Sequence, residues 1–349
     1  MRVVVVGATG NVGTSLVRVL SADPAVTSVV GVARRQPEWA LPKVEWVAAD
    51  VSRDDLVGPF AGADAVVHLA WLIQPSHRLD VLEATNVAGS KRVFEAAARA
   101  GVGALVYASS IGAYSPGPKH QPVDESWPTE GIGSSFYSRH KAAVERMLDA
   151  FEAEHPAVRV VRLRPGLIFK REAASGIRRL FLGRLLPPQL LRPSRIPLVP
   201  RTERLVFQAV HTDDVAEAYR RAVVGGVRGP FNIAADPILD PEELGRLLDA
   251  RAVPVPAKVL RVAADLSWRA HVQPTPAGWV DLAVGVPVMG TARARRELDW
   301  APTRTSGEAL VELLEGLADR AFGPTPALAR EGWRAPAISP VSPQVPTSP

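Results

Sequence analysis

The sequence predicts an α/β fold built on a doubly wound parallel sheet, followed by a smaller C-terminal lobe. Four consecutive valines, Val3–Val6, open the chain. Such a run indicates a strand covered on both faces, because a strand with one solvent-exposed face would alternate between apolar and polar residues. Gly7, Gly10 and Gly13 follow at intervals of three residues, directly before a segment with helical spacing. Strand-like runs and helical segments then alternate, as they do in parallel sheets.

The later elements continue this alternation as far as Pro165. Apolar runs predict buried strands, and helical periodicity predicts helices between them. The strands are expected at residues 26–33, 44–49, 65–70, 104–108 and 158–163, and the helices at residues 79–100 and 137–154. The stretch LLPPQLLRPSRIPLVP at residues 185–200 is too rich in proline for a long helix or a central strand. A strand returns at FNIA from Phe231, and a helix capped by Asp240 is expected at residues 241–251.

These boundaries predict two units and a tail. Residues 1–165, joined by residues 206–235, form the sheet unit, and residues 166–205 and 236–323 form the smaller lobe. Residues 324–349 are rich in proline, serine and alanine and lack regular apolar spacing. We expect this tail to be disordered, because it has too little apolar surface to offset the entropy of ordering it.

Composition excludes several classes of protein. With 349 residues, 47% of them hydrophobic, the chain can bury a large core and is not a fully disordered protein. It has no cysteine, which excludes disulfides and thiolate sites, and its seven histidines show no metal-binding spacing. No segment has the length and apolar character of a signal peptide or a membrane span. We therefore expect a cytoplasmic protein with no metal site and no integral membrane segment.

The formal net charge is +5, and the excess is concentrated between Arg159 and Arg204, where Glu172 and Glu203 are the only acidic residues. Such a block favours anionic partners, although a solvated basic surface explains it equally well. No nucleic-acid-binding motif accompanies the charge, so we expect no nucleic-acid partner. Contact with a membrane surface stays open, although prolines in this segment prevent a long amphipathic helix.

The glycine-rich turn after the first strand predicts a dinucleotide site. Glycine lets backbone amides approach a pyrophosphate closely, and the helix that follows directs its positive end toward the same anion. The predicted contacts are Gly7, Thr9, Gly10, Asn11, Val12 and Gly13. The unit formed by residues 1–165 and 206–235 is thus a predicted dinucleotide-binding Rossmann domain, and the smaller lobe is the predicted substrate-binding part.

Several later stretches occur along the chain in the same order as the motifs of a known family. After the G-x-x-G-x-x-G turn come VVHLAW, NVAGS, YASSIGAY, YSRHK, RPGLIF, HTDDVA and FNIA. This series resembles the extended branch of the short-chain dehydrogenase/reductase superfamily, the NAD-dependent epimerases, dehydratases and reductases, over about residues 1–235. The resemblance implies further cofactor contacts, with an acid against the adenine, a structural asparagine and a proline beside the nicotinamide amide. These residues are Asp50, Val51, Leu69, Ala70, Asn86, Tyr137, Lys141 and Pro165.

Three residues are candidates for catalysis. Tyr137 and Lys141 are four residues apart in YSRHK, so a helix would place both on one face. A nearby ammonium favours the phenolate form of a tyrosine and so makes it a better acid or base at neutral pH. Ser110 follows a strand, at the edge where doubly wound sheets bind ligands. The resemblance implies that Ser110 hydrogen-bonds the substrate oxygen, with Ser109 as the competing candidate.

Other polar residues near these motifs have simpler explanations. We expect His68 and His211 to be packed or capping residues, and one of Asp213 and Asp214 to cap the helix that follows His211. Two positions depart from the family pattern. Trp71 replaces a small residue after HLA and Lys170 replaces a glycine after RPGLIF, and both are expected to lie at the mouth of the active site.

The end of the second strand indicates which dinucleotide is bound. Proteins that bind NAD place an acid at this position. This strand ends instead in Ala33, Arg34 and Arg35, which favours the 2′-phosphate of NADP. NAD is left open as the alternative. The predicted function is an NAD(P)-dependent oxidoreductase acting on a carbonyl or secondary alcohol of a small, anionic or hydrophobic substrate. A nucleotide-sugar epimerase or dehydratase with retained NAD(P), and a non-catalytic dinucleotide sensor, are the alternatives. A homodimer is also left open.

Overall fold

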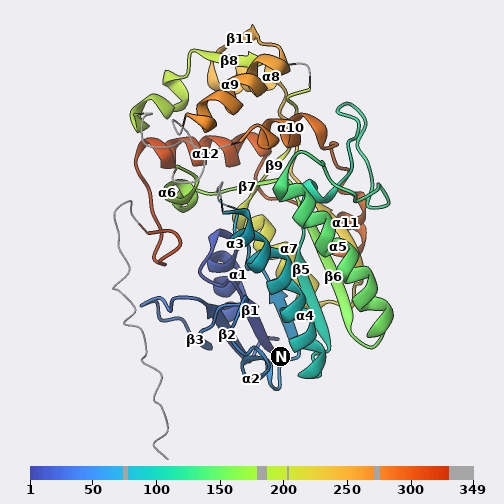
Figure 1. The fold of residues 1–349 in the computed structure, drawn as a ribbon. Coiled ribbons are helices and arrows are strands. Elements are labelled where there is room, and N and C mark those ends of the chain that lie inside the picture. Colours follow the sequence, from blue (N-terminus) through green and yellow to red (C-terminus); the bar gives the residue numbers. More distant parts are fainter. Residues whose placement is uncertain (74–77, 179–186, 203, 271–275, 330–349) are drawn as a thin grey trace, which may run out of the picture.

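A seven-stranded parallel sheet forms the centre of the molecule, in the strand order β10-β6-β5-β4-β1-β2-β3 (Figure 1). The computed structural model describes residues 1–73, 78–178, 187–202, 204–270 and 276–329. The strands of this sheet are β1 (Arg2–Val6), β2 (Ser28–Ala33), β3 (Val44–Ala48), β4 (Ala65–His68), β5 (Ala104–Ala108), β6 (Arg159–Pro165) and β10 (Gly229–Ile233). The predicted doubly wound parallel sheet is confirmed.

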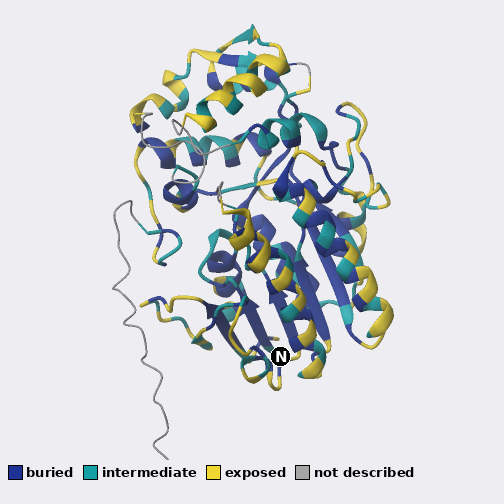
Figure 2. Ribbon diagram, in the orientation of Figure 1, coloured by how far each residue is buried: buried dark blue, intermediate teal, exposed yellow. Residues whose placement is uncertain are grey.

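Helices cover both faces of this sheet, which explains the opening run of valines. Val3 and Val5 pack toward α1 (Asn11–Ala22) and α7 (Thr212–Val224), whereas Val4 and Val6 pack toward α4 (Gly89–Arg99) and α5 (Phe136–Glu154). All four valines are buried (Figure 2). The alternation of a strand therefore sends its side chains into two different cores, and no position can be polar.

The predicted helix over residues 79–100 is interrupted. It consists of α3 (Leu79–Glu83), a π-helical turn at Ala84–Ala88 and α4. The predicted cap Asp240 is confirmed, because its side chain accepts a hydrogen bond from the amide of Glu243 at 2.7 Å. The capped helix, α8, ends at Leu248, before the left-handed residue Asp249. The short helix α2 (Val57–Phe60) precedes β4.

The smaller lobe lies at the carboxyl end of the main sheet, at the top of Figure 1. Two short parallel pairs supply its strands, β7 with β9 and β8 with β11. Its elements are β7 (Leu167–Phe169), α6 (Ala174–Ile177), β8 (Leu198–Arg201), β9 (Ala209–His211), α8 (Pro241–Leu248), β11 (Arg251–Pro254), α9 (Ala257–Arg269), α10 (Gly278–Gly285) and α12 (Ser306–Ala318). Helix α11 (Ala292–Glu297) packs instead against β10 of the main sheet. Within the described ranges, no helix combines the length and apolar character needed to cross a membrane.

Two segments differ from the predicted division of the chain. Ala294, Leu298 and Trp300, expected in the lobe, belong to the core beneath the main sheet, where the Trp300 indole donates to the carbonyl of Asp214 at 2.8 Å. The predicted tail also begins later than residue 324, because Thr325 and Leu328 are both buried. The rest of that tail, residues 330–349, lies outside the described residues.

Candidate active site

The predicted site residues gather at one edge of the main sheet, because all of its strands are parallel and their carboxyl ends meet there. The glycine turn follows β1, Arg34 follows β2, Asp50 follows β3, Leu69 follows β4 and Ser110 follows β5. Pro165 is the last residue of β6. This is the edge at which doubly wound sheets bind ligands.

The turn after β1 has a backbone that only glycine permits. Gly7 has φ +87°, and a Cβ on it would lie 2.6 Å from the amide nitrogen of Ala70. A Cβ on Gly13 would lie 2.4 Å from the carbonyl oxygen of Gly7. Helix α1 begins after Gly10 with no side-chain cap and no acid in its first turn, so far as the described residues show. The amides at its start, including those of Asn11 and Val12, suit a pyrophosphate.

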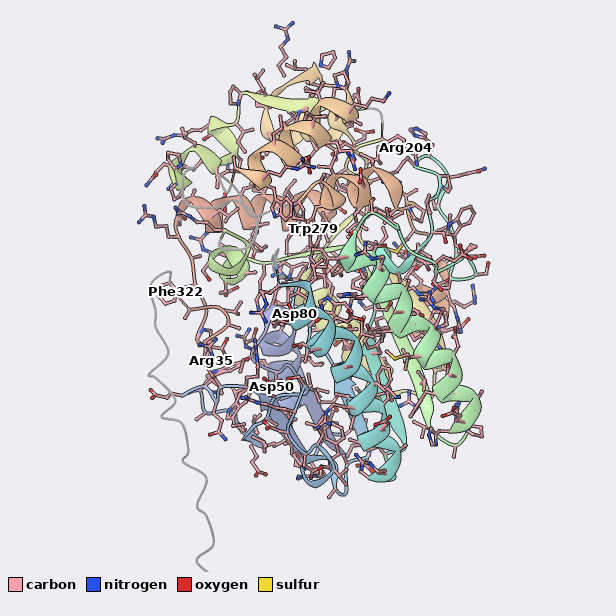
Figure 3. All side chains as sticks on the ribbon, in the orientation of Figure 1. Arg35, Asp50, Asp80, Arg204, Trp279 and Phe322 are labelled. Carbon is pink, nitrogen blue, oxygen red and sulfur yellow. The ribbon has the colours of Figure 1, made fainter. Side chains whose placement is uncertain are left out.

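The adenosine side of the predicted site is exposed and charged. Arg34 and Arg35 are exposed beyond β2, and Figure 3 shows Arg35 and Asp50 on the same side of the molecule. Burial opposes ionisation of Asp50, but hydrogen bonds from Ser52 and the charge of Arg34 lower the pKa of Asp50 below its usual value. Val51 is buried next to it. This side can therefore hold polar and anionic groups.

Asn86, a predicted cofactor contact, has the structural role that the resemblance implies for it. Its side chain is fully buried, its Oδ1 accepts from the Leu72 amide at 2.7 Å, and its Nδ2 donates to the Leu72 carbonyl at 2.9 Å. Both polar atoms are thus used within the protein. Asn86 fixes the loop that carries Leu69, Ala70 and Trp71.

Ser110 and Tyr137 meet between β5 and α5. The Ser110 hydroxyl lies near the Tyr137 phenol, close enough to lower its pKa, and accepts from the Gly112 amide at 3.0 Å. A Cβ on Gly112 would lie 2.7 Å from the Tyr137 ring, so glycine makes room for the phenol. Burial raises the pKa of Tyr137 to about 12, and the nearby Ser110 hydroxyl opposes this shift. The unliganded tyrosine is a protonated phenol at neutral pH.

Lys141 lies beside Tyr137, as the spacing of four residues predicts. Its Nζ is 5.9 Å from the centre of the Tyr137 ring, donates to the Ala108 carbonyl at 2.6 Å and lies 3.4 Å from the centre of the Trp71 ring. Burial holds the pKa of Lys141 well below its usual value, while Glu145 opposes that shift. Trp71, one of the two departures from the family pattern, therefore lies at the site, as predicted.

Ser109, the competing serine, has a different environment. Its hydroxyl donates to Glu145 Oε1 at 2.5 Å, and Glu145 is fully buried. Arg164 forms two hydrogen bonds to the same carboxylate, at 2.9 and 3.0 Å, and Arg162 forms another at 3.0 Å. Burial alone would raise the pKa of Glu145, but these arginines and Ser109 hold it down, at about 2. Ser109 therefore belongs to a buried ionic network below the site.

The two histidines are packed and capping residues, as expected. Burial lowers the pKa of His68 to about 3, and its Nε2 lies 2.9 Å from the Ser90 hydroxyl. The His211 side chain caps α7 by accepting from the Asp213 amide at 3.1 Å. The prediction that Asp213 or Asp214 is the cap is wrong. Asp213 accepts from Ser15 at 2.7 Å, and Asp214 accepts from the hydroxyl of Thr303 at 2.6 Å.

The basic block does not form one surface. Arg159 donates to three carbonyls at the end of α7, at Ala222, Val223 and Val227. Arg162 and Arg164 belong to the buried network, and Arg171 and Arg192 pair with Asp319 at 2.6 and 2.7 Å. Lys170, expected at the mouth of the site, is instead buried against the start of α1. Much of the charge is structural rather than available to an anionic partner.

Trp279, on α10, is a site residue that the sequence analysis missed. Its ring centre is 5.2 Å from that of Tyr137, and Figure 3 places it between the lobe and the main sheet. Together with Ile132, Leu282 and Val286 it makes the lobe side of the site apolar. No local pattern marks Trp279, because it comes far along the chain from the motifs. No grouping of side chains suited to a metal ion occurs in the part of the chain that the structure describes.

Comparisons with known proteins agree with this fold. The family model described as the NAD dependent epimerase/dehydratase family matches residues 3–234. An uncharacterised protein of Mycobacterium tuberculosis is 26% identical over 326 residues, covering 90% of this chain and 83% of the relative. The sterol-4-alpha-carboxylate 3-dehydrogenase of Candida albicans is 31% identical over 144 residues, 39% of this chain and 40% of the relative. The structure of UDP-glucose 4-epimerase from Thermotoga maritima with UDP-glucose has a TM-score of 0.68 at 20% identity, covering 92% of this chain and 99% of that chain.

Proposed function

Because the chain belongs to the NAD dependent epimerase/dehydratase family, we propose that it is an oxidoreductase that interconverts a carbonyl and a secondary alcohol. The single observation that carries this proposal is the meeting of Ser110, Tyr137 and Lys141 at the carboxyl edge of the sheet. Their side chains come from two elements, the end of β5 and the first turns of α5. A non-catalytic sensor would not need this arrangement beside its dinucleotide.

Tyr137 is the proposed acid and base. As a protonated phenol it can donate to the oxygen of a carbonyl substrate, and in the reverse direction its phenolate accepts the proton of an alcohol. The ammonium of Lys141 stabilises the phenolate. Ser110, which lies near the phenol, holds the substrate oxygen in place. A bound nicotinamide supplies or accepts the hydride.

The proposed dinucleotide contacts are the turn at Gly7–Gly13, the loop at Leu69 and Ala70, and Pro165 beside the nicotinamide. A Cβ at Gly7 or Gly13 would collide with backbone atoms of the protein, so glycine at both positions permits the tight turn that presents the amides at the start of α1 to a pyrophosphate. Arg34 and Arg35 support a preference for NADP over NAD, because an exposed guanidinium can pair with a 2′-phosphate.

A hydrophobic carbonyl compound is the proposed substrate. The surroundings of Tyr137 are the aromatic rings of Trp71 and Trp279, 6.1 and 5.2 Å away between ring centres, and the aliphatic side chains of Ile111, Ile132 and Leu282. Apolar walls of this kind bind apolar surface and leave orientation to a few polar groups. The name of the sterol dehydrogenase relative describes action on a substrate of this class.

An epimerase or dehydratase acting on a nucleotide sugar is the second candidate, and the likeness to an epimerase structure with UDP-glucose supports it. Mass analysis of the purified protein under native conditions separates the two. A dinucleotide retained through purification favours the epimerase or dehydratase, because such enzymes regenerate it in each cycle. An empty site that accepts dinucleotide from solution favours the oxidoreductase.

The decisive variant is Tyr137→Phe, which keeps the aromatic ring and removes the phenolic hydroxyl group that would transfer the proton. Turnover of a panel of hydrophobic ketones and alcohols should fall by about 10²- to 10⁴-fold, the usual share of general acid and base catalysis. Dinucleotide affinity should stay close to that of the wild type. Tyr219→Phe, at a fully buried tyrosine of α7, is the matched control and should retain turnover. Full activity in Tyr137→Phe would refute the mechanism, and dinucleotide binding without any turnover would favour the sensor.

A further inference from the structure

Two residues from the C-terminal half of the chain hold backbone carbonyls of the glycine turn. The Thr325 hydroxyl donates to the carbonyl of Thr9 at 2.7 Å. The Lys170 ammonium donates to the carbonyl of Asn11 at 2.9 Å. Both residues are at least nine-tenths buried. Neither belongs to the motifs of the first 165 residues, and the sequence analysis gave neither of them this role.

Thr325 lies in a compact turn that follows α12. The amide of Gly323 donates to the carbonyl of Leu328 at 2.8 Å, and the amide of Leu328 donates to the carbonyl of Thr325 at 2.9 Å. Leu328 is buried, and its carbonyl also accepts from Ser175 of α6 at 3.0 Å. The turn is therefore attached to the lobe on one side and to the glycine turn on the other.

Lys170 comes directly after β7 and reaches the first turn of α1. Its Nζ also donates to the hydroxyls of Thr14 at 2.8 Å and Ser15 at 3.2 Å, so all of its hydrogen-bonding capacity is used. Burial lowers the pKa of Lys170 to about 8, opposed by the carboxylates of Glu172 and Asp213. A charge in this position is expensive to bury, which indicates a function beyond packing.

Peptide planarity links these carbonyls to the anion site. The carbonyl of Thr9 and the amide of Gly10 belong to one rigid plane, and this amide donates to the Gly7 carbonyl at 3.1 Å, which closes the turn. The carbonyl of Asn11 and the amide of Val12 form a second plane, at the start of α1. Fixing each oxygen therefore fixes the direction of the N–H that follows it. An ammonium on the Asn11 carbonyl also polarises that peptide and strengthens its amide as a donor.

We propose that Thr325 and Lys170 are positioning residues of the dinucleotide site. Thr325 holds the closed form of the glycine turn, and Lys170 orients the Val12 amide toward the pyrophosphate. The lobe thereby takes part in binding the cofactor without touching it. This proposal rests on the dinucleotide chemistry of the family and not on the proton chemistry of Tyr137. The test measures dinucleotide binding rather than turnover. The positioning role of Thr325 and Lys170 and the catalytic role of Tyr137 can therefore fail separately.

The first measurement is a titration of the full chain with NADH and with NADPH. Thr325→Val should weaken both by about twofold to tenfold, the range of one neutral hydrogen bond, and Thr325→Ser should restore the affinity. Lys170→Met should weaken both by about tenfold to a hundredfold, the range for a charged donor.

The chain offers a matched control for each variant. Thr202 is a buried threonine of the lobe whose hydroxyl donates to the carbonyl of Val255 at 2.6 Å. Lys119 is a buried lysine whose Nζ donates to the carbonyls of Val206 and Ala283 at 2.9 and 2.8 Å. Thr202→Val and Lys119→Met should lower stability but leave both dissociation constants within about twofold of the wild type. Control variants that weaken dinucleotide binding as much as Thr325→Val and Lys170→Met would overturn the proposal.

The second measurement uses the reciprocity of linked equilibria. Arg320 is exposed just before the compact turn, so trypsin cleavage after it reports opening of this segment. Saturating NADH should slow that cleavage several-fold in the wild type and have little effect in Thr325→Val. Equal cleavage rates with and without NADH in the wild type would show that the turn and the cofactor are uncoupled, and the inference would be wrong.

Discussion

Helix α5 in the main unit and helix α9 in the lobe differ in how their side chains are used. On α5, Val144 and Leu148 are fully buried and Glu145 is paired with arginines inside the protein. None of the thirteen residues of α9 is buried, and Val259 and Leu266 are 55% and 61% exposed. Figure 2 shows the same contrast between the dark strands of the sheet and the exposed top of the lobe. The same kinds of residue therefore contribute very differently to stability in the two regions.

The largest expected effect is at the centre of the buried network. Glu145→Gln removes the acidic partner of the buried Arg164 guanidinium, whereas Arg162 keeps Asp149 and Glu152, and breaking such a buried pair costs about 3–5 kcal/mol. Urea unfolding should show this loss in the free energy of unfolding. A loss below about 1 kcal/mol would mean that water reaches the network and that the two regions differ less than their burial indicates.

The next effect concerns pH and the buried Lys119, which joins the main unit to the lobe. Burial lowers its pKa to about 7 in the folded protein, whereas the unfolded chain keeps the usual value near 10.5. Between these values the unfolded chain binds more protons, so stability rises with pH. Between pH 7 and 9 the gain should be up to about 2 kcal/mol. Urea unfolding at both pH values checks it, and the rise should be absent in Lys119→Met.

The two tryptophans of the site allow a comparison across the boundary between the units. Trp71, from the main unit, lies on Lys141, and Trp279, from the lobe, lies on Tyr137. Trp71→Leu removes a desolvated cation–π contact of about 2 kcal/mol, so kcat should fall by up to about thirtyfold. Trp279→Leu should raise KM several-fold with little change in kcat. Steady-state kinetics separate these outcomes, and identical effects would mean that both rings do no more than line the site.

The smallest effect is expected at the ion pair that joins α9 to α10. Arg261 Nε lies 2.9 Å from Asp281 Oδ1, but the Arg261 side chain is 51% exposed. Exposed pairs of this kind contribute about 0.2–1 kcal/mol, so Asp281→Asn should be hard to distinguish from the wild type in urea unfolding. A loss as large as that of Glu145→Gln would remove the contrast between the two helices.

Features carried by local pattern could be predicted from the sequence. The valine run, the glycine turn and the spacing of Tyr137 and Lys141 each depend on a few adjacent residues, and the structure has the arrangement that they predict. The parallel arrangement of the strands follows from the alternation of strands and helices. The preference for NADP and the homodimer stay predictions.

Features that depend on distant parts of the chain could not be predicted in this way. Trp279 and Thr325 reach the site only through the packing of the lobe, which has no periodic pattern. The buried acid at Glu145 is an exception, because two arginines of the sequence indicate it. Arg162 and Arg164 are two apart on β6, so they point to one buried face and require an acid on the helix that covers it.

The hydrogen bond between Thr325 and Thr9 also has a consequence for synthesis. It joins residues 316 positions apart. At about 5–20 residues per second, roughly a quarter of a minute to a minute separates the translation of the two threonines. The first loop to leave the ribosome is therefore among the last to receive its full set of contacts, and a nascent chain that stops before residue 325 carries this loop without that bond.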